Sequence, residues 1–126
     1  MKTDKDLVAQ AKSRIQEISV EEADQAIKAA GVLIDVRDDL EYAAGHIPGS
    51  VHLSRGMLEF KMSMNPALQS RDLKIVLYCR TSGRAALAAA SLQEMGYLNI
   101  KSIAGGFEAW KAANKPVAMP DTPNFG

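Results

Sequence analysis

The residues best suited to chemistry in this 126-residue chain gather around its single cysteine, Cys79. The segment that contains it reads Tyr78-Cys79-Arg80-Thr81-Ser82-Gly83-Arg84. A thiolate is a strong nucleophile, and positive charge and hydrogen-bond donors near a cysteine favour the thiolate over the thiol. Two arginines and two hydroxyl side chains after the thiol therefore predict a nucleophile that attacks an anionic substrate and retains a charged fragment. An inert buried cysteine is the alternative, and these polar neighbours count against it.

The chain around Cys79 alternates between strand and helix patterns. Apolar runs at 32–36 and 74–78 are typical of strands buried on both faces of a parallel sheet. Weaker runs predict further strands at 51–53 and 99–103, and helical patterns span 4–16, 19–31, 83–95 and 107–113. Alternating strands and helices predict an α/β fold with a mostly parallel sheet.

Two predicted strands end in polar residues, and ligands of parallel sheets bind at the carboxyl ends of strands. One end carries Asp35 and Arg37, and the other carries Cys79. At Cys79 the chain passes from strand to tight turn to helix, so free backbone N–H groups and the positive end of a helix would surround the sulfur. For Asp35 and Arg37 a structural ion pair is the more ordinary interpretation than catalysis. Arg37 is also spaced to pair with Glu41 on a helix.

Composition limits the function classes. Lys plus Arg equals Asp plus Glu at 15 each, which counts against a protein whose main task is to coat nucleic acid or an anionic membrane. One cysteine excludes an internal disulfide, and one cysteine with two histidines is a poor set for a structural zinc site. No signal-like or membrane-spanning run is visible, and a lone thiol suits a reducing compartment, so we expect a cytoplasmic protein without metal or cofactor.

Four segments of the chain resemble the rhodanese-like (thiosulfate sulfurtransferase) domain family. They are Leu33-Ile34-Asp35-Val36-Arg37, Glu41 to Ser50 with its Gly-His-Ile-Pro-Gly run, Tyr78 to Arg84, and Gly105-Gly106-Phe107-Glu108-Ala109-Trp110. They occur in the family's order and spacing over residues 18–117, which leaves an N-terminal helical extension at 1–17 and a C-terminal tail at 118–126. The resemblance implies a three-layer fold with a five-stranded, mostly parallel sheet flanked by helices. It also implies that the loop after the fourth strand is the active site.

The resemblance further implies a sulfurtransferase mechanism. Cys79 would attack the sulfane sulfur of a small anionic donor such as thiosulfate, release sulfite and carry a persulfide. A thiol, cyanide or a sulfur-accepting protein would then take the outer sulfur, without nucleic acid or membrane as partner. The substrate-binding loop implied by the family comprises Arg80, Thr81, Ser82, Gly83 and Arg84, with Asp35 and Arg37 in support. The chain departs from the family pattern at Ala85, where many members have Ser.

The same residues are also compatible with other functions. The domain would serve as a low-turnover persulfide carrier or interaction module if it handed sulfur to one protein. A cysteine-dependent phosphatase or arsenate reductase ranks lower, because four residues separate Cys79 from Arg84 and phosphatases of related architecture have five. His46 is expected to hydrogen-bond its own Gly-Pro turn rather than act as a base for Cys79.

Three further expectations concern local structure. If Gly83 requires a positive φ, replacing it with Val should damage the loop. Gly105 and Gly106 are expected to let a helix approach a neighbour closely rather than bind phosphate. The Met-rich stretch at 55–64 is expected to be an amphipathic helix that packs Met57, Leu58 and Met64 on the core, with a rim beside the active site as the alternative.

Overall fold

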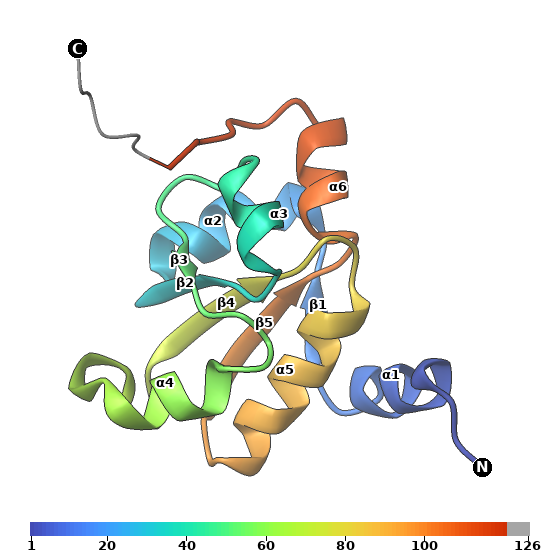
Figure 1. Ribbon diagram of the computed structural model, residues 1–126. Coiled ribbons are helices and arrows are strands. Elements are labelled where there is room, and N and C mark those ends of the chain that lie inside the picture. The colour runs from blue at the N-terminus through green and yellow to red at the C-terminus, as the bar shows by residue number, and fades with distance from the viewer. Residues whose placement is uncertain (121–126) are drawn as a thin grey trace.

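A five-stranded parallel sheet forms the centre of the protein, in a computed structural model that describes residues 1–120 (Figure 1). The strands lie in the order β1-β5-β4-β2-β3, and each neighbouring pair is parallel. Their bounds are β1 (Gln16–Ile18), β2 (Val32–Asp35), β3 (Val51–His52), β4 (Lys74–Tyr78) and β5 (Asn99–Ile103). The predicted α/β class with a five-stranded parallel sheet is confirmed.

Helices cover both faces of the sheet. They are α1 (Asp4–Lys12), α2 (Val20–Ala29), α3 (Asp39–Ala43), α4 (Leu58–Met64), α5 (Gly83–Glu94) and α6 (Gly106–Ala112), with a short 3-10 helix, η1 (Pro66–Leu68). One apolar cluster joins α4 and α5 to the sheet, and a second joins α2 and α6 to the opposite face. Helix α1 packs outside α5, through the buried Ala11 against Ala86 and Ala90.

Strand β4 belongs to both apolar clusters because successive side chains of a strand point to opposite faces. Ile75 and Leu77 pack with α4 and α5, whereas Val76 and Tyr78 pack with α2 and α6. Cys79 continues the first series and packs in the cluster of α4 and α5. The alternation therefore places the thiol on the sheet face that α5 covers.

The N-terminal region differs from its predicted form. The sequence predicts a helix over 4–16, but the helix ends at Lys12 and Gln16–Ile18 forms an edge strand paired with β5. Two of the three residues of β1 are exposed, so the sequence has no apolar pattern that would predict this strand. Its stability comes from backbone pairing with residues 101–103. The proposed domain limits at residues 17 and 117 stay predictions.

The described part of the segment after α6 pairs with the turn after α3. Ala118 and His46 exchange two backbone hydrogen bonds of 2.8 and 2.9 Å. The part of the predicted tail from residue 121 onward lies outside the described residues. Within residues 1–120, no helix has the length and apolar character that crossing a membrane requires.

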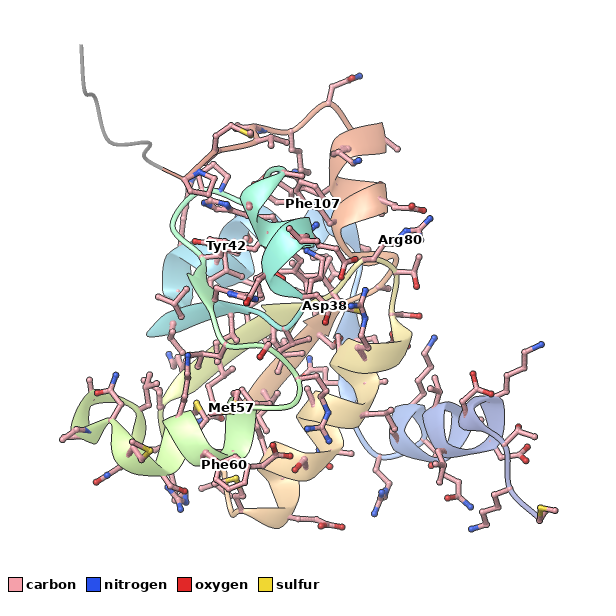
Figure 2. The ribbon with its side chains drawn as sticks, viewed as in Figure 1. Asp38, Tyr42, Met57, Phe60, Arg80 and Phe107 are labelled. Atoms are coloured by element: carbon pink, nitrogen blue, oxygen red, sulfur yellow. The ribbon has the colours of Figure 1, made fainter. Side chains whose placement is uncertain are left out.

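The Met-rich helix α4 packs on the core, but through other residues than the sequence suggests. Leu58 and Met62 are fully buried, whereas Met57 and Met64 are exposed. Figure 2 shows Met57 and Phe60 at the opposite end of the molecule from Arg80 and Phe107. The expected packing of Leu58 is confirmed, and that of Met57 and Met64 is wrong.

Candidate active site

Cys79 lies directly after β4, and α5 begins four residues later at Gly83. The N–H of Ala85, in the first turn of α5, donates a hydrogen bond of 3.3 Å to Cys79 Sγ. Among the residues that the structure describes, no acceptor bonds the N–H groups of 80–84. Unpaired N–H groups beside the positive end of a helix make a site for an anion next to the sulfur.

Helix α6 holds the carbonyl groups of this loop. The N–H of Phe107 donates to the carbonyl oxygen of Cys79 at 2.9 Å, and the N–H of Glu108 donates to that of Arg80 at 3.0 Å. These bonds satisfy the carbonyl groups of Cys79 and Arg80 on the α6 side. The beginning of α6 thus fixes the conformation of the loop after Cys79.

Gly106 makes this contact sterically feasible. Its φ is +55°, and a β-carbon built on it would lie 2.4 Å from the carbonyl oxygen of Cys79 and 2.5 Å from that of Thr81. The expected close approach is confirmed for Gly106, and the neighbour is the cysteine loop itself, whereas a β-carbon on Gly105 would meet Ala109 of α6. By contrast, Gly83 has no positive φ, and a β-carbon there would meet only Val8 at 3.6 Å. The predicted backbone requirement at Gly83 is therefore wrong.

The side chain of Cys79 is buried inside the protein. Cys79 is 1% exposed and packs in the same apolar cluster as Val36 and Ala85. The polar neighbours of Cys79 in the sequence count against a buried cysteine, but the structure buries the residue. The sheet and the core cover one side of the residue, and the loop with the first turn of α5 covers the other.

Arg84 joins the loop to α3 through a paired set of hydrogen bonds. Its Nη1 and Nη2 donate to the two carboxylate oxygens of Glu41 at 2.7 and 2.9 Å, and Asp38 lies 3.8 Å away. The hydrogen bond with Arg84 is the main cause that lowers the pKa of Glu41 to about 2. The same bond raises the pKa of Arg84. The expected pairing of Glu41 with Arg37 is wrong, because Arg84 takes that carboxylate.

The other loop side chains also have partners on neighbouring elements. Arg80 Nε donates to Glu108 of α6 at 2.8 Å, and Ser82 Oγ accepts a hydrogen bond from Lys12 Nζ of α1 at 2.8 Å. Thr81 is exposed. The sequence gives no signal for Lys12 or Glu108, because each lies on an element far from the loop in the chain.

Asp35 and Arg37 form a buried ion pair at the end of β2. Both side chains are buried, and Arg37 Nε and Nη2 donate to Asp35 at 2.8–3.0 Å. Arg37 Nη2 also donates to the carbonyl oxygen of Gly45 at 2.7 Å. Burial opposes the charge of Arg37, but the hydrogen bonds and the charge of Asp35 outweigh it and raise its pKa. This geometry ties the strand end to the turn after α3.

The side chain of His46 packs against helix α3. Its ring stacks on Tyr42 with centroids 3.8 Å apart, and its Nδ1 lies 3.2 Å from the carbonyl oxygen of Tyr42. Its backbone pairs with Ala118. The ring of His46 therefore contacts the end of α3 and not the Gly-Pro turn that the sequence predicts as its partner.

A cavity of about 300 Å³ opens beside the loop, between α3 and the beginning of α6. Arg80, Lys111 and the buried Arg37 contribute positive charge to its wall, and Glu41 and Glu108 contribute negative charge. Figure 2 shows Arg80 and Phe107 at this end of the molecule. The cavity is large enough for a small inorganic anion and for part of a thiol acceptor.

Comparison with known proteins decides the family. The model of the rhodanese-like domain matches residues 19–113. The chain belongs to the rhodanese-like domain family. This confirms the resemblance seen in the four sequence segments.

Relatives of this rhodanese-like chain include proteins described as sulfurtransferases. A sulfurtransferase from Allochromatium vinosum is 32% identical over 90 residues, which are 71% of this chain and 80% of that protein. The polysulfide-sulfur transferase homodimer of Wolinella succinogenes is 30% identical, with a TM-score of 0.75 over 90% of this chain and 85% of that one. Together with the family match, these comparisons support sulfur transfer in general terms for the rhodanese-like chain.

A further similar structure carries a different description. A protein of unknown function from Rhodopseudomonas palustris, described as a possible tyrosine phosphatase, is 36% identical. Its TM-score is 0.86, and the match covers 94% of this chain and 96% of that one. The fold is therefore shared with a protein that is described as a possible tyrosine phosphatase.

Proposed function

We propose that this rhodanese-like protein is a sulfurtransferase that carries sulfane sulfur as a persulfide on Cys79. The observation that carries the proposal is the hydrogen bond from the Ala85 N–H to Cys79 Sγ, in a loop whose other N–H groups have no acceptor within residues 1–120. Such donors stabilise an anion on the sulfur, and both the thiolate and the persulfide are anions. No metal is needed for this stabilisation.

In the first step, the Cys79 thiolate attacks the outer sulfur of a donor such as thiosulfate. A bond forms between Sγ and that sulfur, and the sulfur–sulfur bond of thiosulfate breaks. The bonding electron pair leaves with sulfite, and the cysteine persulfide keeps the negative charge of the thiolate. The loop N–H groups that have no acceptor among residues 1–120 are available for the outer sulfur, which lies one bond beyond Sγ.

In the second step, a nucleophilic acceptor attacks the outer sulfur of the persulfide. Cyanide becomes thiocyanate, or a thiolate becomes a persulfide, and Sγ leaves as the thiolate that starts the next cycle. A cysteine of another protein is an acceptor of the same chemical class. The cavity beside the loop, which Arg80 lines, is the nearest space for such an acceptor to bind.

The charges around the loop support an anionic donor. Arg80 and Lys111 line the cavity, and Arg84 lies at the first turn of α5. The description of the Wolinella relative as a polysulfide-sulfur transferase adds polysulfide to thiosulfate as a donor of this class. Both donors are small anions that present a terminal sulfur.

A phosphatase activity is the second candidate, favoured by the description of the Rhodopseudomonas palustris protein. The four residues between Cys79 and Arg84 count against it. A tetrahedral phosphate needs a wider ring of donors than a single sulfur atom, and phosphatases of related architecture have one more residue in this loop.

Steady-state assays test the proposal. Thiosulfate and cyanide should give equal amounts of sulfite and thiocyanate with the wild-type protein, and none above background with Cys79→Ala. Hydrolysis of p-nitrophenyl phosphate that depends on Cys79, without sulfite release from thiosulfate, would instead establish the phosphatase. Persulfide formation without turnover on small acceptors would identify a sulfur carrier.

A further inference from the structure

Helix α1 brings a lysine to the cysteine loop from outside the matched domain. Lys12 Nζ donates a hydrogen bond of 2.8 Å to Ser82 Oγ, although α1 ends before residue 19, where the family match begins. Figure 1 shows α1 beside α5, on the outer side of that helix. The loop therefore has a cationic neighbour that the matched domain does not contain.

Packing holds α1 in place next to the loop. Ala11, which precedes Lys12, is 1% exposed and lies against Ala86 and Ala90 of α5. Val8 of α1 lies close to Gly83, the first residue of α5. Because α1 is fixed against the first turns of α5, the Lys12 side chain reaches Ser82 from a defined position.

The hydrogen bond leaves Ser82 with a free donor. Ser82 Oγ accepts a hydrogen bond from Lys12 Nζ, so its own O–H remains available as a donor, and within residues 1–120 it makes no hydrogen bond to an acceptor. A hydroxyl that accepts a bond from an ammonium group is polarised and becomes a stronger donor. Ser82 lies just before α5, among the N–H groups that have no acceptor.

Lys12 differs from the two loop arginines in how its charge is compensated. Arg80 lies 2.8 Å from Glu108, and Arg84 lies 2.7 Å from Glu41. The carboxylate paired with Lys12, that of Glu17, is 3.9 Å away, and the shorter contact of Lys12 is with the uncharged Ser82. The charge of Lys12 is thus the least neutralised of the three.

We propose that Lys12 is a positioning residue that acts through the Ser82 hydroxyl to raise the affinity of the cysteine loop for its anionic sulfur donor. The inference rests on the proposed function for the identity of the donor. Lys12 touches Ser82 rather than the reacting sulfur, so its removal should weaken donor binding and leave the chemical step unchanged.

The test compares Lys12→Met with Lys12→Arg and Lys5→Met. Lys5 is an exposed lysine of the same helix, so Lys5→Met makes the same change of charge away from the loop. At constant ionic strength, Lys12→Met should raise the thiosulfate concentration for half-maximal persulfide formation about fivefold, with the limiting rate unchanged. The half-maximal thiosulfate concentration of Lys12→Arg should stay within about twofold of the wild-type value, and that of Lys5→Met should be unchanged.

A double-mutant cycle with Ser82→Ala tests the route of the effect. If Lys12 acts through the hydroxyl, Lys12→Met should add no further loss in the Ser82→Ala background. An undiminished loss in that background would overturn the inference. So would an unchanged half-saturation in Lys12→Met, an equal effect of Lys5→Met, or a fall in the limiting rate alone.

A binding measurement separates this inference from the proposed function. Thiosulfate is titrated into nitrogen-15-labelled Cys79→Ala, which cannot form a persulfide, and the amide shifts of residues 80–85 give the dissociation constant. Adding Lys12→Met should weaken this binding about fivefold. Failure of the wild type to form a persulfide would refute the proposed function, while the titration would still decide the role of Lys12.

Discussion

Gly106 lies so close to Cys79 that a β-carbon built on it would stand 2.4 Å from the Cys79 carbonyl oxygen. The next residue, Phe107, donates its N–H to that same oxygen at 2.9 Å. The cysteine loop is therefore shaped from outside, by the beginning of α6. This contact explains how a loop with several N–H groups that lack an acceptor in the described part of the chain keeps one conformation.

Replacing Gly106 with Ala should damage both stability and activity. The added methyl group would collide with backbone atoms of Cys79 and Thr81, and the φ of +55° disfavours any side chain. We expect the free energy of unfolding to fall by about 2–4 kcal/mol, with loss of sulfur transfer beyond what unfolding explains. Urea unfolding and the thiocyanate assay measure the two effects.

Gly83→Ala and Gly56→Ala are the matched controls. A β-carbon at Gly83 makes only an ordinary contact, and one at Gly56 meets nothing within 4 Å. Gly83 begins α5, where Ala is a better helix former than Gly, so stability should be unchanged or rise by less than about 1 kcal/mol. A Gly106→Ala protein as stable and active as these controls would show that α6 does not shape the loop.

Arg84→Ala should weaken the use of an anionic donor and leave the protein folded. Arg84 is the arginine at the first turn of α5, and its side chain is about one-third exposed. We expect the half-saturating thiosulfate concentration to rise about tenfold, because a guanidinium next to the anion site is lost. Arg14→Ala, which removes an exposed arginine elsewhere, should change nothing. If the two variants had the same half-saturating thiosulfate concentration, Arg84 would not contribute to donor binding.

The ion pair of Glu41 with Arg84 should make stability depend on acid pH. The pKa of Glu41 is lowered from its ordinary 4.5 to about 2, chiefly by the hydrogen bond from Arg84. A lowered carboxyl pKa stabilises the folded state above the unfolded-state pKa, and this contribution is lost as pH falls through the folded-state pKa. Glu41→Gln should therefore be less stable than the wild type at pH 7, by about 1 kcal/mol because the pair is partly solvated.

The difference in the free energy of unfolding between the wild type and Glu41→Gln should decrease as the pH falls from about 5 to about 2. Urea unfolding at a series of pH values measures it. Glu94→Gln, which changes an exposed glutamate of α5, should follow the wild type at every pH. A constant difference between Glu41→Gln and the wild type down to pH 2 would contradict the assignment of the pair.

Asp35→Asn should be the most destabilising of the single charge removals. Asp35 is fully buried and accepts hydrogen bonds from the backbone N–H and the guanidinium of Arg37. Removing its charge leaves a buried arginine without its partner, which costs about 3–5 kcal/mol. Glu108→Gln, which breaks an exposed pair with Arg80, should cost no more than about 1 kcal/mol. Similar urea midpoints for the two variants would refute the bracing role of Asp35.

The sequence predicted the central part of the site well because the deciding patterns are local. The apolar run at 74–78 coincides with β4, and the helix after the loop begins at Gly83 as expected. These two elements place Cys79 at the end of a buried strand. A pattern of about ten residues is enough to predict a strand or a helix of this kind.

The contacts that complete the site were not predictable in the same way. Arg84 with Glu41, Ser82 with Lys12, and the loop with Gly106 each join positions far apart in the chain. Local periodicity determines which elements form, whereas the packing of distant elements determines which side chains meet. The burial of the Cys79 thiol was missed for the same reason, since the core that covers it comes from several elements.

The central claim is that Cys79 carries sulfur as a persulfide, and intact-mass spectrometry after mixing with thiosulfate tests it most directly. The protein should gain the mass of one sulfur atom, lose it on treatment with cyanide, and show no gain as Cys79→Ala. A wild-type protein whose mass stays unchanged with both thiosulfate and polysulfide would contradict the claim.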